Sequence, residues 1–191
     1  MSAAGLSAVA IGGSAGAVQA LSRILPGLPA DYPLPVLVVV HVPPDRDNAL
    51  VALFDAKCQV EVKEAEDKEP ARPGVVYFAP SDYHLLVEAD GTLSLSSDEL
   101  VNLSRPSIDV LFESAADAYG PSLVAVMLTG ANHDGAQGLR AAADAGGVAI
   151  VEDPASAYAS AMPVAALRAC SEAKTMNLDA IASYLSSLRT A

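Results

Sequence analysis

The chain has 191 residues, which is the length of one α/β domain and too short for two cores of useful size. It carries 11 basic and 23 acidic side chains, a formal net charge of −12, which argues against a nucleic-acid partner and against docking on an anionic membrane. Hydrophobic residues make up 52 % of the chain and aromatic residues only 5 %, so a folded domain with an aliphatic core is predicted.

The sequence lacks the marks of a secreted or membrane-spanning protein. Its longest apolar run, residues 34–42, is interrupted by Pro35 and ends at His41, well short of the roughly 20 residues of a span. Residues 1–4 lack the basic segment of a signal peptide. Cys58 and Cys170 are spaced neither as a disulfide framework nor as a metal cluster. We therefore expect a cytoplasmic protein with two free thiols, no metal and no cofactor.

Apolar runs typical of buried strands alternate with segments of helical periodicity. In chain order, strands are expected over residues 6–11, 35–40, 75–79, 123–128 and 148–151. Helices are expected from Val18 to Pro26, from about Asp47 after the pair Pro43-Pro44, from Ile108 to Gly120, over residues 136–145, and near residues 164–168 and 178–188.

Two segments depart from this alternation. Residues 61–69 are mostly charged and are interpreted as a strand edge followed by a solvated loop. Residues 85–88 and 92–95 flank Asp90-Gly91, a strong signal for a β-hairpin. The fold class predicted is therefore α/β: a single, doubly wound, mainly parallel sheet flanked by helices, with one antiparallel hairpin. Ligands of such sheets gather at the carboxyl ends of the strands.

The segment Gly12-Gly13-Ser14-Ala15-Gly16 follows the first predicted strand and precedes the first helix. It matches G-x-S-x-G, in which a nucleophilic serine stands on a tight strand-to-helix turn. Free N–H groups at the start of the helix could stabilise an oxyanion. The same residues also fit a phosphate-binding loop or a purely structural turn, and the residues alone leave all three open.

A nucleophilic serine needs a base and an orienting carboxylate. His41 ends the second predicted strand and is expected at the same sheet edge as Ser14, although a His next to prolines is also common in surface loops. For the carboxylate, Asp134 and Asp153 both follow strands, and Asp134 could equally be a helix N-cap. Their positions in the sequence do not decide between them, whereas Asp109 and Asp144 fall on helices.

Several separate motifs between about Ala8 and Arg168 resemble the catalytic domain of the chemotaxis protein-glutamate methylesterases of the CheB type. They are residues 10–16 (AIGGSAG), 40–43 (VHVP), 80–84 (PSDYH), 104–112 (SRPSIDVLF) and 128–135 (LTGANHDG). The resemblance implies a serine hydrolase that removes methyl esters from glutamate side chains of chemoreceptor cytoplasmic helices, with glutamine deamidation as a further activity. It places the nucleophile on Ser14, the base on His41 and the carboxylate on Asp134.

The resemblance also suggests the oxyanion donors. Backbone N–H groups near Ala15 and Ala131 would fill this role. Ala131 stands where the family often has Met, and Ala15 where it often has Thr. These departures keep open a non-catalytic regulatory or scaffolding role in a chemosensory pathway. A nucleotide-binding module is the remaining alternative.

Four further residues are candidates for a substrate cleft: Tyr83, His84, Arg105 and Ser107. The structural alternatives are that Arg105 pairs with a surface acid and that Ser107 caps the helix beginning at Ile108.

Full-length members of the family carry an N-terminal receiver domain, whereas the esterase motif here begins by residue 12. We therefore expect either an excised domain or a stand-alone form, with residues 1–191 as one catalytic domain. Its site should be open and constitutively active, and regulation would come from substrate tethering or from a separate partner.

Overall fold

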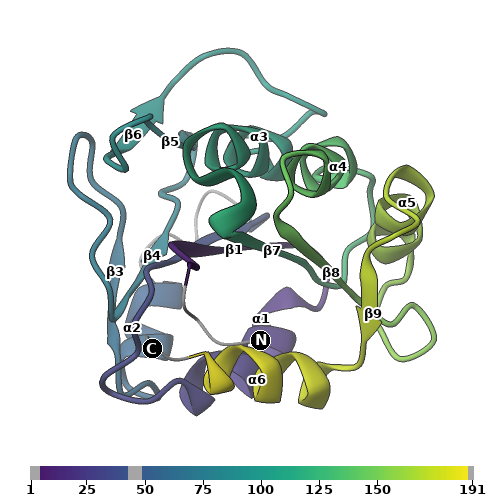
Figure 1. Cartoon of the computed structure of the whole chain (residues 1–191), viewed down its shortest axis with the longest axis horizontal. Coiled ribbons are helices and arrows are strands. Elements are labelled where there is room, and N and C mark those ends of the chain that lie inside the picture. Colours follow the sequence, from purple (N-terminus) through teal and green to yellow (C-terminus); the bar gives the residue numbers. More distant parts are fainter. Residues whose placement is uncertain (1–4, 43–48, 189–191) are drawn as a thin grey trace.

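The computed structural model describes residues 5–42 and 49–188, and its centre is a parallel sheet of seven strands in the order β3-β4-β2-β1-β7-β8-β9 (Figure 1). The strands are β1 (Ala8–Gly13), β2 (Val36–Val40), β3 (Glu61–Glu64), β4 (Val75–Phe78), β7 (Leu123–Met127), β8 (Val148–Glu152) and β9 (Lys174–Met176). The three central strands β2, β1 and β7 are buried along their whole length, as their continuous apolar sequences predict.

Helices cover both faces of the sheet. On one face lie α1 (Ala17–Ile24), α2 (Ala49–Asp55) and α6 (Leu178–Ser187), and on the other α3 (Ile108–Tyr119), α4 (Ala136–Asp144) and α5 (Ala161–Ala169) (Figure 1). Alternate residues of β1 enter two separate cores: Val9 and Ile11 pack under α1, whereas Ala8 and Ala10 pack under α3. This arrangement confirms the predicted doubly wound α/β fold.

The predicted hairpin is also present, as a separate two-stranded sheet. β5 (His84–Val87) pairs antiparallel with β6 (Leu93–Ser96), with Leu85 opposite Leu95. Between them, Asp90 accepts a hydrogen bond from the Thr92 N–H (3.0 Å). Leu85, Val87 and Leu93 join the same core as α3, so the hairpin fixes the position of the segment that leads into that helix.

Of the two edge strands of the sheet, one agrees with the sequence-based expectation and the other does not. The charged segment 61–69 contributes the edge strand β3, in line with its interpretation as a strand edge. The opposite edge strand, β9, was not predicted, because its three residues are half-buried or exposed and carry no apolar run. Cys58 and Cys170 are free thiols, as expected. Pro43, Pro44 and Asp47 lie outside the described residues.

Candidate active site

Ser14 occupies the turn between β1 and α1, at the middle of the carboxyl edge of the sheet. Its N–H donates to the Thr129 carbonyl at the end of β7 (2.9 Å), and its carbonyl accepts from the Ala17 N–H in the first turn of α1 (2.9 Å). Gly16 makes this turn possible: its φ is +83°, and a Cβ there would lie 2.6 Å from the side chain of Tyr158. Only glycine fits both the left-handed backbone and the space.

The imidazole of His41 lies next to this turn. His41 directly follows β2, and its N–H donates to the Gly13 carbonyl (3.2 Å), which continues the β1–β2 ladder to the end of both strands. The ring nitrogen Nε2 lies 2.8 Å from Oδ2 of Asp134. In the described part of the chain no hydrogen bond joins the Ser14 hydroxyl to the ring. Such contacts often form only once substrate is bound.

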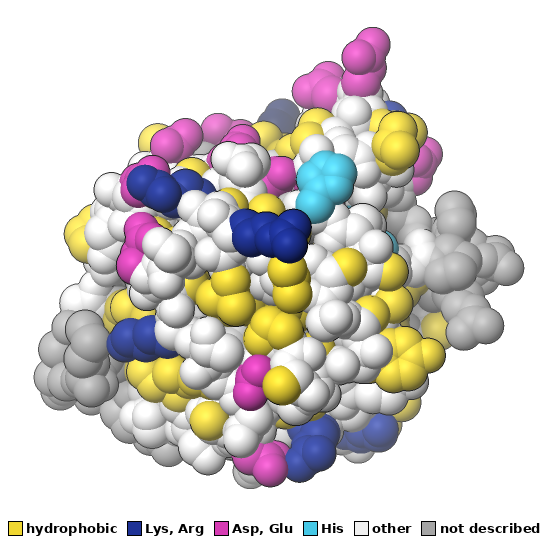
Figure 2. Space-filling model, turned by 90° about the vertical axis from the view of Figure 1, so that its right-hand side faces the viewer, with side chains coloured by type: hydrophobic (Ala, Val, Ile, Leu, Met, Phe, Trp, Pro, Cys, Tyr) yellow, Lys and Arg dark blue, Asp and Glu magenta, His cyan; other side chains and the backbone are white. Residues whose placement is uncertain are grey.

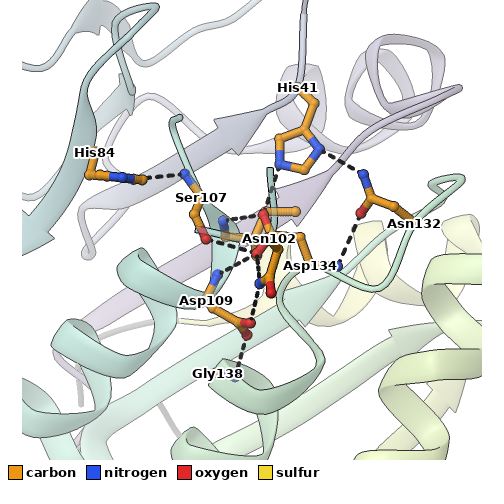
Figure 3. A network of polar contacts seen from close by, with 9 residues as sticks. His41, His84, Asn102, Ser107, Asp109, Asn132, Asp134 and Gly138 are labelled. Carbon is orange, nitrogen blue, oxygen red and sulfur yellow. Dashed lines mark hydrogen bonds and ion pairs between the residues drawn. The ribbon is translucent and has the colours of Figure 1, made fainter. Parts of the chain in front are cut away.

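Asp134 is fully buried and is the centre of the polar network in Figure 3. Its Oδ2 accepts hydrogen bonds from His41 and from the Ile108 N–H (2.7 Å). Its Oδ1 accepts from Asn102 Nδ2 (2.8 Å), Ser107 Oγ (2.8 Å) and the Asp109 N–H (3.2 Å). Two of these donors are backbone N–H groups at the N-terminus of α3, where the helix dipole also favours a negative charge.

These contacts keep the carboxylate ionised. Burial alone would raise the pKa of Asp134, but the hydrogen bonds from His41, Asn102, Ile108 and Ser107 outweigh it and lower the pKa from 3.8 to about 2. A carboxylate accepts hydrogen bonds and donates none, so Nε2 of His41 carries the proton of this contact. The other ring nitrogen, Nδ1, is then the one with a free lone pair.

Asn132 lies on the other side of the imidazole. Its Oδ1 accepts from the Asp134 N–H (3.0 Å), which turns its amide nitrogen toward Nδ1 of His41 at 3.4 Å. Asn102 is a second amide in the network, because its Nδ2 bridges Asp134 and the carboxyl group of Asp109 (2.7 Å). Burial raises the pKa of Asp109, against the opposing hydrogen bonds from the Gly138 N–H and Asn102. Neither amide was expected at the site from the sequence, although Asn132 lies within the motif at residues 128–135.

The other carboxylate considered, Asp153, has a different role. Its Oδ1 accepts from the Ala155 N–H (2.9 Å) in the turn after β8, and it makes no hydrogen bond to His41. Among the described residues, the backbone N–H groups of Ala15 and Ala131 have no acceptor, so both are available as donors to a ligand at this edge.

The candidate cleft residues are spread over several environments. His84 is buried, and its ring links the Glu99 carbonyl (2.9 Å) to the Ser107 N–H (3.1 Å). Ser107 makes no side-chain cap to α3, because its hydroxyl donates to Asp134 instead. Arg105 pairs with Asp82 (2.7 Å) and donates to two backbone carbonyls. Tyr83 is exposed.

Arg105, one of these four candidates, lines the same cavity of about 220 Å³ as His41. Its lining residues are Val40, His41, Val42, Ala79, Ser81, Leu103, Ser104, Arg105 and Pro106. A second, shallower cleft lies on the side of α4 and α5 and includes His133, Gln137 and Arg168. Figure 2 shows that side of the molecule, where apolar side chains form small clusters separated by charged and polar ones.

No group of three or more His, Cys, Asp or Glu side chains within residues 5–42 and 49–188 is arranged to hold a metal ion. Over the same residues, none of the helices combines the length and apolarity that crossing a bilayer requires.

The fold is a doubly wound α/β sheet, and a hydroxyl, an imidazole and a buried carboxylate lie along its carboxyl edge, the set of groups that serine hydrolases use. Residues 9–185 match the family model of the CheB methylesterases. The crystal structure of the Thermotoga maritima CheB methylesterase catalytic domain is similar, with a TM-score of 0.90 and 34 % identity over 94 % of this chain and 97 % of that one. The chain belongs to the CheB methylesterase family.

Two relatives place the length of the chain in context. A Leptospira interrogans protein is 46 % identical over 175 residues, which are 92 % of this chain and 91 % of that protein. A protein-glutamate methylesterase/protein-glutamine glutaminase of Archaeoglobus fulgidus is 41 % identical over 162 residues, 83 % of this chain but 46 % of the relative. The family domain therefore occurs both in proteins of about this length and in longer ones.

Proposed function

We propose that the protein hydrolyses methyl esters on glutamate side chains of chemoreceptors, with Ser14 as nucleophile, His41 as base and Asp134 as the orienting carboxylate. The observation that carries this proposal is the His41–Asp134 contact of 2.8 Å next to a serine on a strand-to-helix turn. Family membership supports the choice of ester. We further propose that residues 1–191 act as one catalytic unit in the cytoplasm.

In the first half of the reaction, the Ser14 Oγ attacks the ester carbonyl carbon while Nδ1 of His41 takes the hydroxyl proton. Because Nε2 already donates to Asp134, the imidazolium formed is stabilised by the ionised carboxylate. The amide of Asn132 gives up Nδ1 at this step, and its 3.4 Å separation makes that contact easy to break. The oxyanion is bound by the backbone N–H groups of Ala15 and Ala131.

In the second half, the C–OCH3 bond breaks and His41 returns its proton to the leaving group, which departs as methanol. The acyl group remains on Ser14 as an ester. Water then attacks this ester while His41 accepts a proton from the water. When the second tetrahedral intermediate collapses, the bond between the carbonyl carbon and the Ser14 Oγ breaks and His41 returns the proton to that Oγ, which releases glutamate and restores the free serine. With a glutamine side chain, ammonia takes the place of methanol and the product is the same glutamate.

The test is methanol release from methylated receptor by the purified chain. We expect turnover in the wild type and a loss on the order of 10⁶-fold in Ser14→Ala, as found when the nucleophile of another serine hydrolase is removed. Ser171→Ala is the matched control, because Ser171 is exposed and, within the described part of the chain, its hydroxyl hydrogen-bonds only to the neighbouring Glu172. Wild-type protein that releases no methanol and is not labelled by a fluorophosphonate would refute the proposal and favour the non-catalytic role.

A further inference from the structure

A tight turn beside the cavity has an unusual backbone for its sequence. Val101 and Ser104 exchange two backbone hydrogen bonds, of 3.1 and 2.9 Å. Between them Asn102 has a φ of +52° and Leu103 a φ of +61°. Two consecutive left-handed residues define a type I′ turn, whose second central position is normally glycine. A leucine there strains the backbone, because its Cβ crowds the following carbonyl.

The side chain of Leu103 does not compensate for this strain by packing. It is 92 % exposed, more than any other large apolar side chain among the described residues. Burial against the protein itself therefore cannot explain why a leucine occupies this position. Strained residues persist where the surroundings hold them, and they concentrate at sites of function.

The surroundings that hold this turn belong to the active site. Asn102 Nδ2 donates to Asp109 (2.7 Å) and to Asp134 (2.8 Å), and both carboxyl groups are buried. The turn is thus tied to the carboxylate that orients His41. Leu103 lines the same cavity as His41 and is exposed to solvent, so it lies at the rim of the cavity that leads to the imidazole.

The charges around the rim indicate what Leu103 can contact. Arg105, the cation of this cavity, is already held by Asp82 and by the carbonyls of Ser97 and Asp98. Asp82, Asp98 and Glu99 add negative charge nearby. Among the residues that the structure describes, an acidic segment would find no unpaired cation in the lining of this cavity, whereas an apolar segment would bury Leu103.

We propose that Leu103 is a docking residue for the protein substrate, and that it packs against apolar side chains next to the ester-bearing residue. This inference rests on the proposed function. A protein segment that delivers an ester to His41 through this cavity passes over Leu103. Because Asn102 fixes the turn to Asp134, the docked segment is held in register with the catalytic groups.

The experiment compares two esters, methylated receptor and a short peptide with one glutamate methyl ester, in wild type and Leu103→Gly. Glycine removes the side chain and relieves the backbone strain, so the melting temperature should stay the same or rise. On the receptor we expect kcat/KM to fall by about tenfold or more, mainly through KM, as for a leucine that is buried on binding. The loss on the short peptide should be several-fold smaller. Leu103→Asn, which also tolerates left-handed backbone, should behave in the same way.

Leu100→Ala is the matched control, because Leu100 is 55 % exposed on the same segment but does not line the cavity. It should lose less than about threefold, the usual range for a surface substitution. A Leu103→Gly variant with wild-type KM on the receptor, or with equal losses on both esters, would overturn the docking role while leaving the proposed function intact. A wild type that demethylates neither ester would overturn both.

Discussion

Replacing Asp134 with Asn tests the charge of the site at nearly constant shape. Oδ2 of Asp134 faces two donors and Oδ1 faces three. An amide in its place turns its NH2 group toward one of these sets in either orientation. The less costly orientation faces the pair at Oδ2, where His41 can change tautomer and accept from the amide, and it leaves the buried Ile108 N–H without an acceptor. At about 1–3 kcal/mol for such a donor, the free energy of unfolding should fall by about 1–3 kcal/mol. For a chain of this length the melting temperature should then fall by about 2–12 °C.

The catalytic loss should be larger than the loss of stability suggests. Without the carboxylate, the imidazolium that forms when His41 takes the serine proton has no anion beside it, and the ring is no longer held as the Nε2–H tautomer. The same substitution in another serine hydrolase lowers kcat by about 10⁴, so we expect a loss of about 10³ to 10⁴ in methanol release at saturating receptor, measured below the melting temperature of the variant.

Asp153→Asn is the control for this experiment. Asp153 also follows a strand, but its side chain accepts a hydrogen bond only within its own turn, so the variant should lose about 1 kcal/mol of stability at most and should keep most of the wild-type kcat. The reasoning fails if folded Asp134→Asn keeps more than about a tenth of the activity. It also fails if Asp153→Asn loses as much.

Three further predictions concern stability. Because the pKa of Asp134 is lowered to about 2, the stability that its ionisation contributes is fully present above about pH 4 and is lost as the pH falls toward 2. In denaturant titrations over this window, the loss of stability should be ~2 kcal/mol larger in wild type than in Asp134→Asn, in which the other carboxyl groups still titrate. Gly16→Ala should lower the free energy of unfolding by at least about 1–2 kcal/mol, because the backbone there is left-handed and the added methyl group would lie 2.6 Å from Tyr158. The control is Gly27→Ala, whose methyl group has no atom nearby and which should be neutral or stabilising in the same titration. Burial raises the pKa of Glu152, so ionisation of this side chain opposes folding as the pH rises above the ordinary value of 4.5. Glu152→Gln keeps an acceptor for the Thr129 N–H, and the stability of the variant relative to wild type should increase between pH 4 and 7. A stability difference that does not change with pH would contradict this prediction.

The sheet could be predicted from the sequence because each central strand carries its own signal. β2, for example, is the run Val36–Val40, buried at every residue, and a strand covered on both faces needs apolar residues throughout. β9 has no such signal. Its three residues become a strand because β8 offers hydrogen bonds at Ile150, Val151 and Glu152, and a partner's free edge cannot be read from local sequence.

The choice between Asp134 and Asp153 depended on strand order for the same reason. Both residues follow a strand, so both were expected at the correct edge. In the structure β1, which leads to Ser14, lies between β2 and β7, and β8 is one strand farther away. Among the described residues, the hydrogen bonds to the imidazole that follows β2 come from the loop after β7. Strand order is a property of the whole sheet and cannot be derived from either residue's local sequence. At the sequence level, only the family resemblance favoured Asp134 over Asp153.

The donors around Asp134 show a further limit of local patterns. Sequence rules look for the cap of α3 in the residues just before Ile108, and therefore offered Ser107. In the structure the N–H groups of Ile108 and Asp109 are satisfied by Asp134, which is about 25 residues away in the chain. The carboxylate is thus both the partner of His41 and the acceptor at the N-terminus of a 12-residue helix. One ionised group stabilises the helix and orients the imidazole, so a substitution that weakens the start of α3 should also disturb the site, even where it touches neither Ser14 nor His41.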